Sequence, residues 1–576
     1  MGAGHREILV SLVNFVYFII LIGVLIFFHE LGHFLAAKAF GVKVLKFALG
    51  FGRALVSFTW KETTYAVNWF PLGGYVKMLG QEPSELRPEE LPEEEDRSRA
   101  FDQKPRWQRL LIIMAGPLFN LILPLPIYFL FLISQSALPP ATVGSVIPDS
   151  PAWMAGLKPG DRIVSIDEQP IRYWEEMEQK INSSPDQTLR MVVLRHDEQL
   201  ELQITPASSH IPNRIKALSR TVGLIGVTQA FLGAQLGVLG PETVAGRAGL
   251  KSWDVVLQAD GMKVSKWVDL EEIFAKHAGR SLQLTVLRPE VDREGDELDL
   301  REVVEKEQGS KLAISLPVPP AGTPRAAGLD PGEFFVFKVD PGGAAERAGI
   351  GRGDRILSVD GESCANLQLC FRHFREEPEE IHTVTFLRPG SEAGAAEVRF
   401  QAEIEKKLNE VKQEEIHARI GLVNRSLLLP AEPVPNEHRW SRAVVGSFWQ
   451  NWMMIKLNAL GLGLLATGQI SAKTVGGPIM MFDLAGKAAQ RGWEDFLWLL
   501  AVISINLGLI NLLPIPILDG GQIVFLGVEA VKRGPLSLRA RIIAAYVGLT
   551  IIIFLMVFAF KNDIERYWDD FARLFQ

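Results

Sequence analysis

The sequence predicts a polytopic α-helical membrane protein, with about four transmembrane helices, a membrane-associated β-hairpin region and three α+β modules outside the membrane. Its 576 residues are 48% hydrophobic and only 22% charged, which indicates that part of the chain lies in lipid. Four stretches lack Lys, Arg, Asp and Glu over a length that crosses a hydrocarbon core of about 30 Å. A sequence pattern also occurs three times between the second and third stretches. The predicted spans are Ile8–Phe28, Leu110–Ser134, Phe496–Leu518 and Ile542–Phe560.

The first span lies near the N-terminus, so a cleaved signal peptide is the competing interpretation. The apolar run is longer than the usual core of a signal peptide, and no small-residue cleavage site follows it. We therefore expect it to be retained. A further apolar stretch, Val444–Ala466, contains Lys456, Gln450 and Asn451, which favours an amphipathic helix on the membrane or against the protein.

Basic residues near the span ends predict the orientation of the chain. Lys and Arg gather on the cytoplasmic side of membrane spans, and here they precede the second and fourth spans. In a four-span protein those two loops share one face. Both termini and the segment from about 135 to 495 then lie outside, in the periplasm or at the cell surface. The basic residues are Lys104, Arg106 and Arg109 before the second span, and Lys532, Arg533, Arg539 and Arg541 before the fourth.

Charge and cysteine content exclude several classes of protein. The net charge of -7 offers no basic surface for a phosphate backbone, so we expect no nucleic-acid partner. Cys364 and Cys370 are too few for a disulfide framework and lack the spacing of a zinc site. They are structural, or they form one disulfide in an oxidising compartment.

The exterior segment contains three copies of one pattern. Each copy has an Ala-Gly-Leu or Ala-Gly-Ile step, beginning at Ala155, Ala248 and Ala348, followed by an acidic turn and a short apolar strand. This spacing is typical of small β-rich domains rather than of solenoid repeats. The copies resemble PDZ domains of the bacterial type, whose groove adds an extended peptide as a further strand. The alternative is that these modules form a steric filter over the membrane part.

The sequence His29-Glu30-Leu31-Gly32-His33 is an HExxH motif at the inner end of the first span. Residues four apart share one face of a helix, so both imidazoles can reach one ion while Glu30 flanks a bound water. This arrangement suits a zinc metalloprotease. Ionisable residues that continue a membrane span are costly in lipid, which favours a functional site.

A catalytic zinc with two His ligands needs a third protein ligand, and Phe34–Lys38 contains no carboxylate. Asp519 follows the third span, on the side that carries HExxH in the predicted topology. Its alternative role is that of a turn or cap residue before Gly520. Pro514 and Pro516 interrupt the helix there, and irregular backbone at membrane depth occurs where protein or a cavity covers it.

These motifs resemble the site-2 protease family of intramembrane zinc metalloproteases, which pairs HExxH with a later NxxPxPxxDG motif. The resemblance implies Zn²⁺ bound by His29, His33 and Asp519, Glu30 as general base, and Asn511 as a stabiliser of the reacting carbonyl. Members with PDZ modules between the second and third spans cut single-span membrane proteins such as anti-sigma factors, and also remnant signal peptides. The resemblance therefore implies regulated intramembrane proteolysis in a bacterial inner membrane, with periplasmic modules and an active site toward the cytoplasm.

Other segments fit this resemblance. Residues 41–78 alternate apolar side chains and look like the family's membrane-associated β-hairpins, which here either contact substrate or brace the first helix. The expected substrate-binding residues are Gly50, Gly52, Gly73 and Gly74. Asn120 belongs to a GPxxN sequence in the second span, and we expect it to satisfy broken backbone close to the first helix.

The sequence is also compatible with a different class of protein, in which HExxH has a structural role. This class is a membrane-bound PDZ scaffold, or a metal-dependent channel or transporter. Formation of a cleaved product would separate these alternatives. The predicted segments are 1–40, the first span with HExxH; 41–106, the β-region and cytoplasmic loop; 107–135, the second span; 140–207, 220–318 and 330–423, the three modules; 440–494, the amphipathic helix and connector; 495–541, the third span with NxxPxPxxDG; and 542–576, the fourth span and tail.

Overall fold

A computed structural model describes residues 3–81, 97–211, 219–289, 300–364, 367–391, 394–409, 414–534 and 536–574. The chain divides into two compact units, which we treat separately. We call Met1–Ser136, Asn409–Gln413 and Asn436–Gln576 the membrane unit, and we call Ala137–Leu408 and Glu414–Pro435 the module unit.

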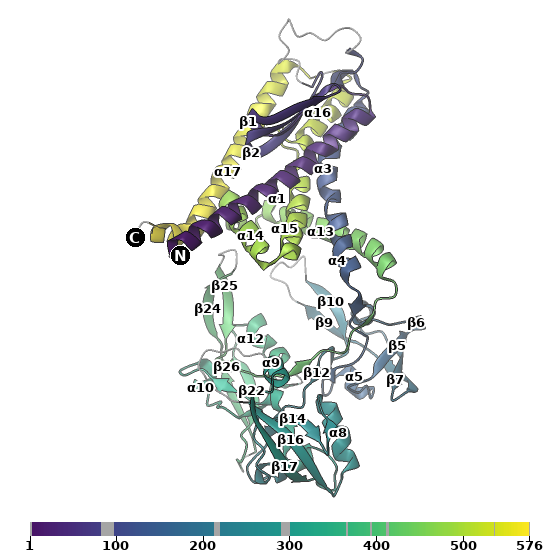
Figure 1. Cartoon of the computed structure of the whole chain (residues 1–576), viewed down its shortest axis with the longest axis vertical. Coiled ribbons are helices and arrows are strands. Elements are labelled where there is room, and N and C mark those ends of the chain that lie inside the picture. The colour runs from purple at the N-terminus through teal and green to yellow at the C-terminus, as the bar shows by residue number, and fades with distance from the viewer. Residues whose placement is uncertain are drawn as a thin grey trace. The chain divides into compact units, whose positions relative to one another are not determined.

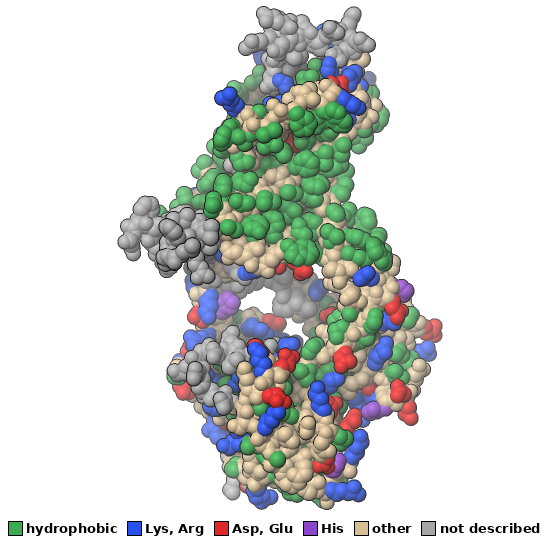
Figure 2. Space-filling view, viewed as in Figure 1, with side chains coloured by type: hydrophobic (Ala, Val, Ile, Leu, Met, Phe, Trp, Pro, Cys, Tyr) green, Lys and Arg blue, Asp and Glu red, His purple; other side chains and the backbone are tan. Residues whose placement is uncertain are grey.

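The membrane unit is built mainly from helices (Figure 1). Within the described residues, four segments are long and apolar enough to cross a membrane: Leu12–Ala39, Arg106–Ser134, Trp493–Asn511 and Arg539–Trp568. The visible face of this unit is an almost continuous hydrophobic surface (Figure 2), as expected for side chains that face lipid. Its helices are α1 (Ala3–Ala39), α3 (Arg106–Ile122), α4 (Pro124–Ser134), α13 (Arg439–Ala466), α14 (Pro478–Arg491), α15 (Trp493–Asn511), α16 (Asp519–Lys532) and α17 (Leu538–Leu574), with short 3-10 turns at Phe101–Gln103 and Ala472–Thr474.

The first span agrees with the sequence prediction, and the second differs from it in detail. Helix α1 continues without a break through the HExxH motif to Ala39, so the motif lies on the first helix, as predicted. The second span is two consecutive helices, because Pro124 at the start of α4 has no N–H to continue the ladder of α3.

The third span is shorter than predicted. Helix α15 ends at Asn511 rather than at Leu518, and Asp519 is the first residue of the next helix, α16. Pro514 and Pro516 account for this difference, since neither can donate a helical hydrogen bond. The charge-free composition that defined the predicted span continues through this irregular loop.

Helix α13 covers the apolar stretch for which we expected an amphipathic helix. It packs against the second span: Asn451 donates to the carbonyl of Leu121 at 2.9 Å, and Gly446 lies against Leu132. Trp449 and Trp452 are exposed on α13, as is common for helices at a membrane surface.

Strands β1 (Val44–Trp60) and β2 (Thr63–Met78) form the β-region beside α1. Both strands bend, and Phe47 of β1 consequently pairs with Val76 on one side and with Tyr65 on the other. Residues 74–78 therefore form an edge of this sheet. Elsewhere in the same two strands, the side chains of Trp60 and Trp69 are strongly exposed.

The module unit repeats one α+β arrangement three times. Each copy has a four-stranded sheet with the same strand order: β6-β5-β7-β8, β15-β14-β16-β17 and β21-β20-β22-β23. A short helix precedes the first long strand of each sheet, and a second helical segment follows its hairpin. Charged side chains are spread over this unit (Figure 2).

The first copy comprises β3 (Ala137–Leu138), β4 (Ser145–Val146), α5 (Pro151–Met154), β5 (Arg162–Ile166), β6 (Gln169–Pro170), α6 (Trp174–Asn182), β7 (Leu189–Arg195), β8 (Glu198–Ile204), β9 (Ala207–Ile211), β10 (Arg220–Leu224) and β11 (Val227–Thr228). The second comprises β12 (Phe231–Leu232), β13 (Leu236–Val238), α7 (Val244–Arg247), β14 (Val255–Ala259), β15 (Met262–Lys263), α8 (Trp267–Lys276), β16 (Ser281–Pro289), α9 (Leu300–Glu305), β17 (Gly309–Pro317), a 3-10 turn (Arg325–Ala327) and β18 (Leu329–Pro331). The third comprises a 3-10 turn (Gly332–Phe334), β19 (Lys338–Val339), α10 (Ala344–Arg347), β20 (Arg355–Val359), β21 (Glu362–Ser363), α11 (Leu367–Cys370), α12 (Arg372–Glu376), β22 (His382–Leu387), β23 (Ala395–Phe400), β24 (Glu403–Leu408), β25 (Glu414–Arg419) and β26 (Leu422–Val423), followed by β27 (Leu428–Leu429) and β28 (Val434–Pro435).

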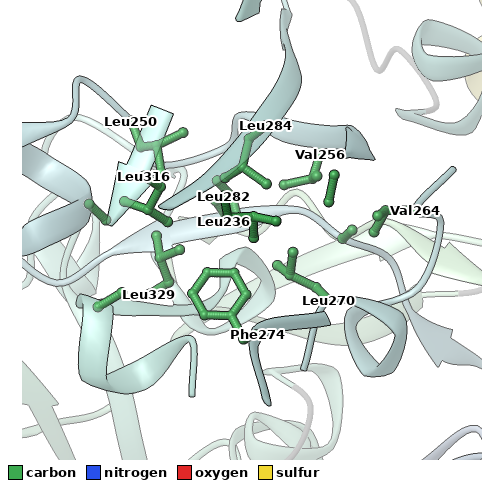
Figure 3. Close-up of a cluster of buried hydrophobic side chains, with 14 of the residues drawn as sticks. Leu236, Leu250, Val256, Val264, Leu270, Phe274, Leu282, Leu284, Leu316 and Leu329 are labelled. Carbon is green, nitrogen blue, oxygen red and sulfur yellow. The ribbon is translucent and has the colours of Figure 1, made fainter. Parts of the chain in front are cut away.

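Each copy has its own hydrophobic core between sheet and helices. In the second copy Phe274 of α8 lies among Leu236, Leu282 and Leu329 (Figure 3). Cys364 and Cys370 form a disulfide in the core of the third copy, which is the second of the two alternatives left by the sequence.

The predicted limits of the first two modules are too short. Strand β11 pairs with β4, so the first copy extends past residue 207, and β18 pairs with β13, so the second extends past residue 318. In both cases the closing strand follows a loop or hairpin, and it is too short to stand out in the sequence.

An ion pair with a buried carboxylate recurs in all three copies. Asp161, Asp254 and Asp354, from the acidic turn of the repeat, are each 1% exposed. Each accepts a bidentate hydrogen bond from the Arg at the equivalent position of the sheet, whose guanidinium also donates to the glycine carbonyl of the Ala-Gly step. The pairs are Arg195–Asp161, Arg288–Asp254 and Arg388–Asp354, with donation to the carbonyls of Gly156, Gly249 and Gly349.

Candidate metal centre

His29 and His33 lie one turn apart on α1, and their rings face the same side of the helix. Their Nε2 atoms are 3.3 Å apart. Helical geometry alone brings residues four apart onto one face, as the sequence predicted. The turn is packed tightly against α3: a Cβ added at Gly32 would lie 2.2 Å from the carbonyl oxygen of Ala115.

Asp519 reaches the two imidazoles from the start of α16. Its Oδ2 lies 3.2 Å from His29 Nε2 and 3.5 Å from His33 Nε2. The three side chains are the one group of His, Cys, Asp or Glu in the described residues whose ligand atoms converge as a metal site requires. The loop with Pro514 and Pro516 ends the preceding helix and lets Asp519 begin a new one beside α1.

The spacing of these atoms fits a tetrahedral metal ion. Metal–ligand bonds of about 2.0–2.1 Å in a zinc site separate neighbouring ligand atoms by about 3.3–3.4 Å. The three observed separations are 3.2, 3.3 and 3.5 Å. The donor set also leaves the fourth position open, as in catalytic zinc sites.

The hydrogen bond of His33 selects the nitrogen that can bind metal. Its Nδ1 lies 2.8 Å from the carbonyl oxygen of Ile112, which can only accept, so Nδ1 carries the proton and Nε2 keeps its lone pair. Gly116 leaves room for this ring, because a Cβ there would lie 2.2 Å from His33 Nε2.

Glu30 lies between the two histidines in sequence and faces the sheet edge in space. A Cβ at Gly74 of β2 would lie 3.1 Å from Glu30 Cγ, and the backbone N–H of Val76 hydrogen bonds to its carboxylate. The residue expected as general base thus adjoins both His29 and His33 and a strand edge.

Comparison with known proteins agrees with this geometry. The model of peptidase family M50 matches residues 17–555. The chain belongs to peptidase family M50. The regulator of sigma-E protease RseP of Escherichia coli is 28% identical over 558 residues, covering 95% of this chain and 98% of that protein. Protease RseP of Yersinia pestis is 27% identical, and the match covers 95% of this chain and 98% of that protein. A protein of Ralstonia nicotianae named as a candidate zinc metalloprotease is 28% identical, and the match covers 95% of this chain and 97% of that protein.

The M50 assignment confirms the resemblance to site-2 proteases that the two motifs indicated. The chain is a site-2 type metalloprotease, and the scaffold and channel alternatives are set aside. The four candidate spans agree with a membrane protease.

Asn120 has a contact in this M50 chain that the sequence did not predict. Its amide lies 3.2 Å from Nδ1 of His29, and Asn511, the last residue of α15, also reaches this nitrogen, at 3.5 Å. The buried Oδ1 of Asn120 has no hydrogen-bond partner among the described residues. The oxygen and nitrogen of an amide are interchangeable by a half-turn, which would present Oδ1 to a proton on His29 Nδ1. The GPxxN sequence was the only signal for this contact.

The four glycines expected to contact substrate have different surroundings. Gly74 lies against Glu30, as described above. Gly50 and Gly73 have positive φ values of 81° and 110° where the strands bend, and a Cβ at Gly73 would lie 2.1 Å from the ring of Phe51. Gly52 also has positive φ but has open space around it. Of the four, Gly74 alone lies against Glu30 of the HExxH motif.

Proposed function

We propose that this chain is a zinc metalloendopeptidase that cleaves single-span membrane proteins within the membrane. The observation that carries this proposal is the convergence of three ligand atoms at 3.2–3.5 Å: His29 Nε2 and His33 Nε2 on the first span, and Asp519 Oδ2 at the start of α16. Glu30 lies beside the two histidines on the same helix. The names of the M50 relatives support zinc as the metal.

Glu30, Asn511 and the ligands have distinct roles in this proposal. When bound, zinc would polarise the scissile carbonyl and lower the pKa of a water. Glu30 takes the proton from that water and passes it to the leaving amine. Asn511 lies next to His29 and stabilises the charge that develops on the reacting carbonyl.

The edge at residues 74–78 is the proposed docking position for unwound substrate. A helical substrate hides its peptide bonds in its own hydrogen bonds, so local unwinding precedes the cut. An extended segment can then pair with the exposed edge of a sheet. The contact of Gly74 with Glu30 supports this placement, because a strand added there would run beside the general base. Gly50, Gly52 and Gly73 shape the bends of the same sheet.

The proposed substrates are anti-sigma factor-like proteins and remnant signal peptides. Two relatives that match nearly the whole chain are named regulator of sigma-E protease, which supports the first class. The proposed location is a bacterial inner membrane, with the module unit in the periplasm and the metal centre toward the cytoplasm. The basic residues before the second and fourth spans support this orientation.

The three copies in the module unit are proposed to be PDZ-like. Their common strand order and recurring Arg–Asp pair support a single module type. Peptide binding and steric filtering stay as two alternative roles. In the third copy a cavity of about 430 Å³ lies between β26 and the helices α11 and α12, with Leu367, Phe371 and Leu422 in its lining, and this favours peptide binding there.

The test is cleavage of a model single-span substrate by purified protein in detergent. Wild type, Glu30→Gln and a chelated sample are compared for a cleaved product, with substrates already trimmed on the exterior side as a second set. Cleavage by wild type alone supports the proposal. Equal cleavage by Glu30→Gln would assign the base elsewhere, and absence of cleavage by wild type with both substrate sets would overturn the proposal.

A further inference from the structure

The proposed zinc ligands come from two helices that are far apart in the sequence. His29 and His33 belong to α1, whereas Asp519 is the first residue of α16. Their separations of 3.2 and 3.5 Å therefore depend on how α16 is held against the helices that orient the histidines.

Helix α3 connects the two halves of the site. Its Ile112 carbonyl accepts the hydrogen bond from His33 Nδ1 at 2.8 Å. The side chains of Ile112 and Ile113 also share a buried core with Leu526 of α16. A shift of α16 along α3 would thus move Asp519 relative to His33.

Glu529 lies one turn beyond Leu526 on α16, and its side chain is 3% exposed. Its carboxylate is approached by hydrogen-bond donors from three segments. Arg109, one turn before Ile112 on α3, approaches Glu529 Oε2 at 3.4 Å, and the backbone N–H of Leu536 approaches Oε1 at 3.3 Å. Arg541 of α17 pairs with the same carboxylate.

The pair with Arg109 is the one ion pair between α3 and α16 in the described part of the chain. Hydrophobic packing between two helices resists separation more than sliding, because it is not directional. A buried carboxylate with three converging donors, in contrast, has one position at which all its hydrogen bonds are made.

We propose that Glu529 is a positioning residue for the metal centre: through Arg109 it fixes α16 on α3 and so places Asp519 opposite His29 and His33. This inference rests on the proposed ligand set. Glu529 itself touches neither metal nor substrate, and it acts through the position of Asp519.

The experiment measures metal binding by the full-length protein in detergent. Glu529→Gln should lose zinc to a competing chelator at roughly tenfold lower chelator concentration than wild type, the size of effect seen when the support of a metal ligand is removed. The visible spectrum of the Co²⁺-substituted protein should change, and kcat on a model substrate should fall with little change in KM. Glu529→Asp should recover part of each loss.

Asp563 provides a matched control in the same unit. It is buried on α17 with 0% exposure, and it accepts hydrogen bonds from the backbone N–H groups of Gly477, Ile479 and Met480 at 2.9–3.1 Å. Asp563→Asn disturbs a buried carboxylate network of similar size away from the zinc ligands. It should retain zinc and the Co²⁺ spectrum of wild type.

Two outcomes would overturn the inference: folded Glu529→Gln with wild-type zinc retention and Co²⁺ spectrum, or equal loss of zinc in Asp563→Asn. If Glu529→Gln does not fold, Arg109→Gln is measured by the same criteria, since it leaves Glu529 paired with Arg541. Asp519→Asn separates the two proposals. Zinc retention in that variant would contradict the ligand set, whereas its loss there together with retention in Glu529→Gln would contradict only the role of Glu529.

Discussion

The side-chain amide of Asn120 lies 3.2 Å from Nδ1 of His29, the ring nitrogen opposite the one that faces Asp519. The backbone carbonyl of Asn120 in turn accepts a hydrogen bond from the hydroxyl of Ser504 at 2.7 Å. The second and third spans thereby hold the orientation of a proposed ligand on the first.

Removing the side chain of Asn120 should weaken the metal centre. If His29 binds zinc through Nε2, its Nδ1 carries a proton that needs an acceptor. We expect Asn120→Ala to lower zinc affinity and kcat by roughly ten- to a hundredfold, and Asn120→Asp, which keeps an acceptor, to lose much less. Chelator competition and single-turnover assays measure the two effects. Equal behaviour of the Ala and Asp variants would argue against hydrogen bonding as the cause.

A methyl group at Gly116 should displace His33. The added Cβ would lie 2.2 Å from Nε2 of that ring, closer than any non-bonded contact allows, and the buried packing of α3 on α1 offers no room to yield. We expect Gly116→Ala to lose bound zinc and at least about tenfold in activity. Gly23→Ala on α1 is the control, since nothing lies within 4 Å of its added Cβ. Metal analysis of both purified variants decides the point.

Much of the membrane unit could be predicted because lipid imposes a simple rule of length and charge. The rule depends on composition and takes no account of backbone geometry. The predicted third span therefore continued through Pro514 and Pro516 to Leu518, although the helix ends at Asn511. The two motifs predicted His29, His33 and Asp519 as zinc ligands without any knowledge of the fold, because the motifs are short and specific.

Contacts that depend on how helices cross were not predictable. The approach of Asn120 to His29 joins the second span to the first, and the pairing of Glu529 with Arg109 joins residues at opposite ends of the sequence. Periodicity and spacing describe one segment at a time. The short closing strands β11 and β18 were not predicted for a related reason. A strand of two or three residues is recognised by the strand with which it pairs, and that strand is distant in the sequence.

The repeated Arg–Asp pair should stabilise each module. In the first copy the Asp161 side chain is fully buried and pairs with Arg195 at 2.6 Å, and Asp161 also accepts a hydrogen bond from the Lys158 backbone. Removing the carboxylate takes away the acceptor of these hydrogen bonds, and a hydrogen bond to a charged group is worth about 1.5–3 kcal/mol. We expect Asp161→Ala to lower the unfolding temperature of the module unit by several degrees, measured by tryptophan fluorescence. Glu168→Ala, which removes an 82% exposed partner of Arg190, should change it little.

Glu333 should make the stability of the module unit depend on pH. It lies in the turn between β18 and β19, is 3% exposed, and burial raises the pKa of its carboxyl from 4.5 to about 7. Between these two values the folded chain holds a proton that the unfolded chain releases. The free energy of unfolding should therefore fall as pH rises from about 4.5 to about 7 and level off above that, by at most about 3 kcal/mol from this group.

Glu333→Gln should remove this dependence, because an amide does not titrate and has a similar volume. The measurement compares the unfolding temperature of wild type and variant from about pH 5 to pH 8. We expect the two to agree most closely at the acid end, where Glu333 is protonated in the folded protein, and the variant to be the more stable above pH 7. Glu198→Gln, at an exposed strand position, serves as the control. A constant difference between wild type and Glu333→Gln across this range would mean that Glu333 acts through packing rather than through its proton.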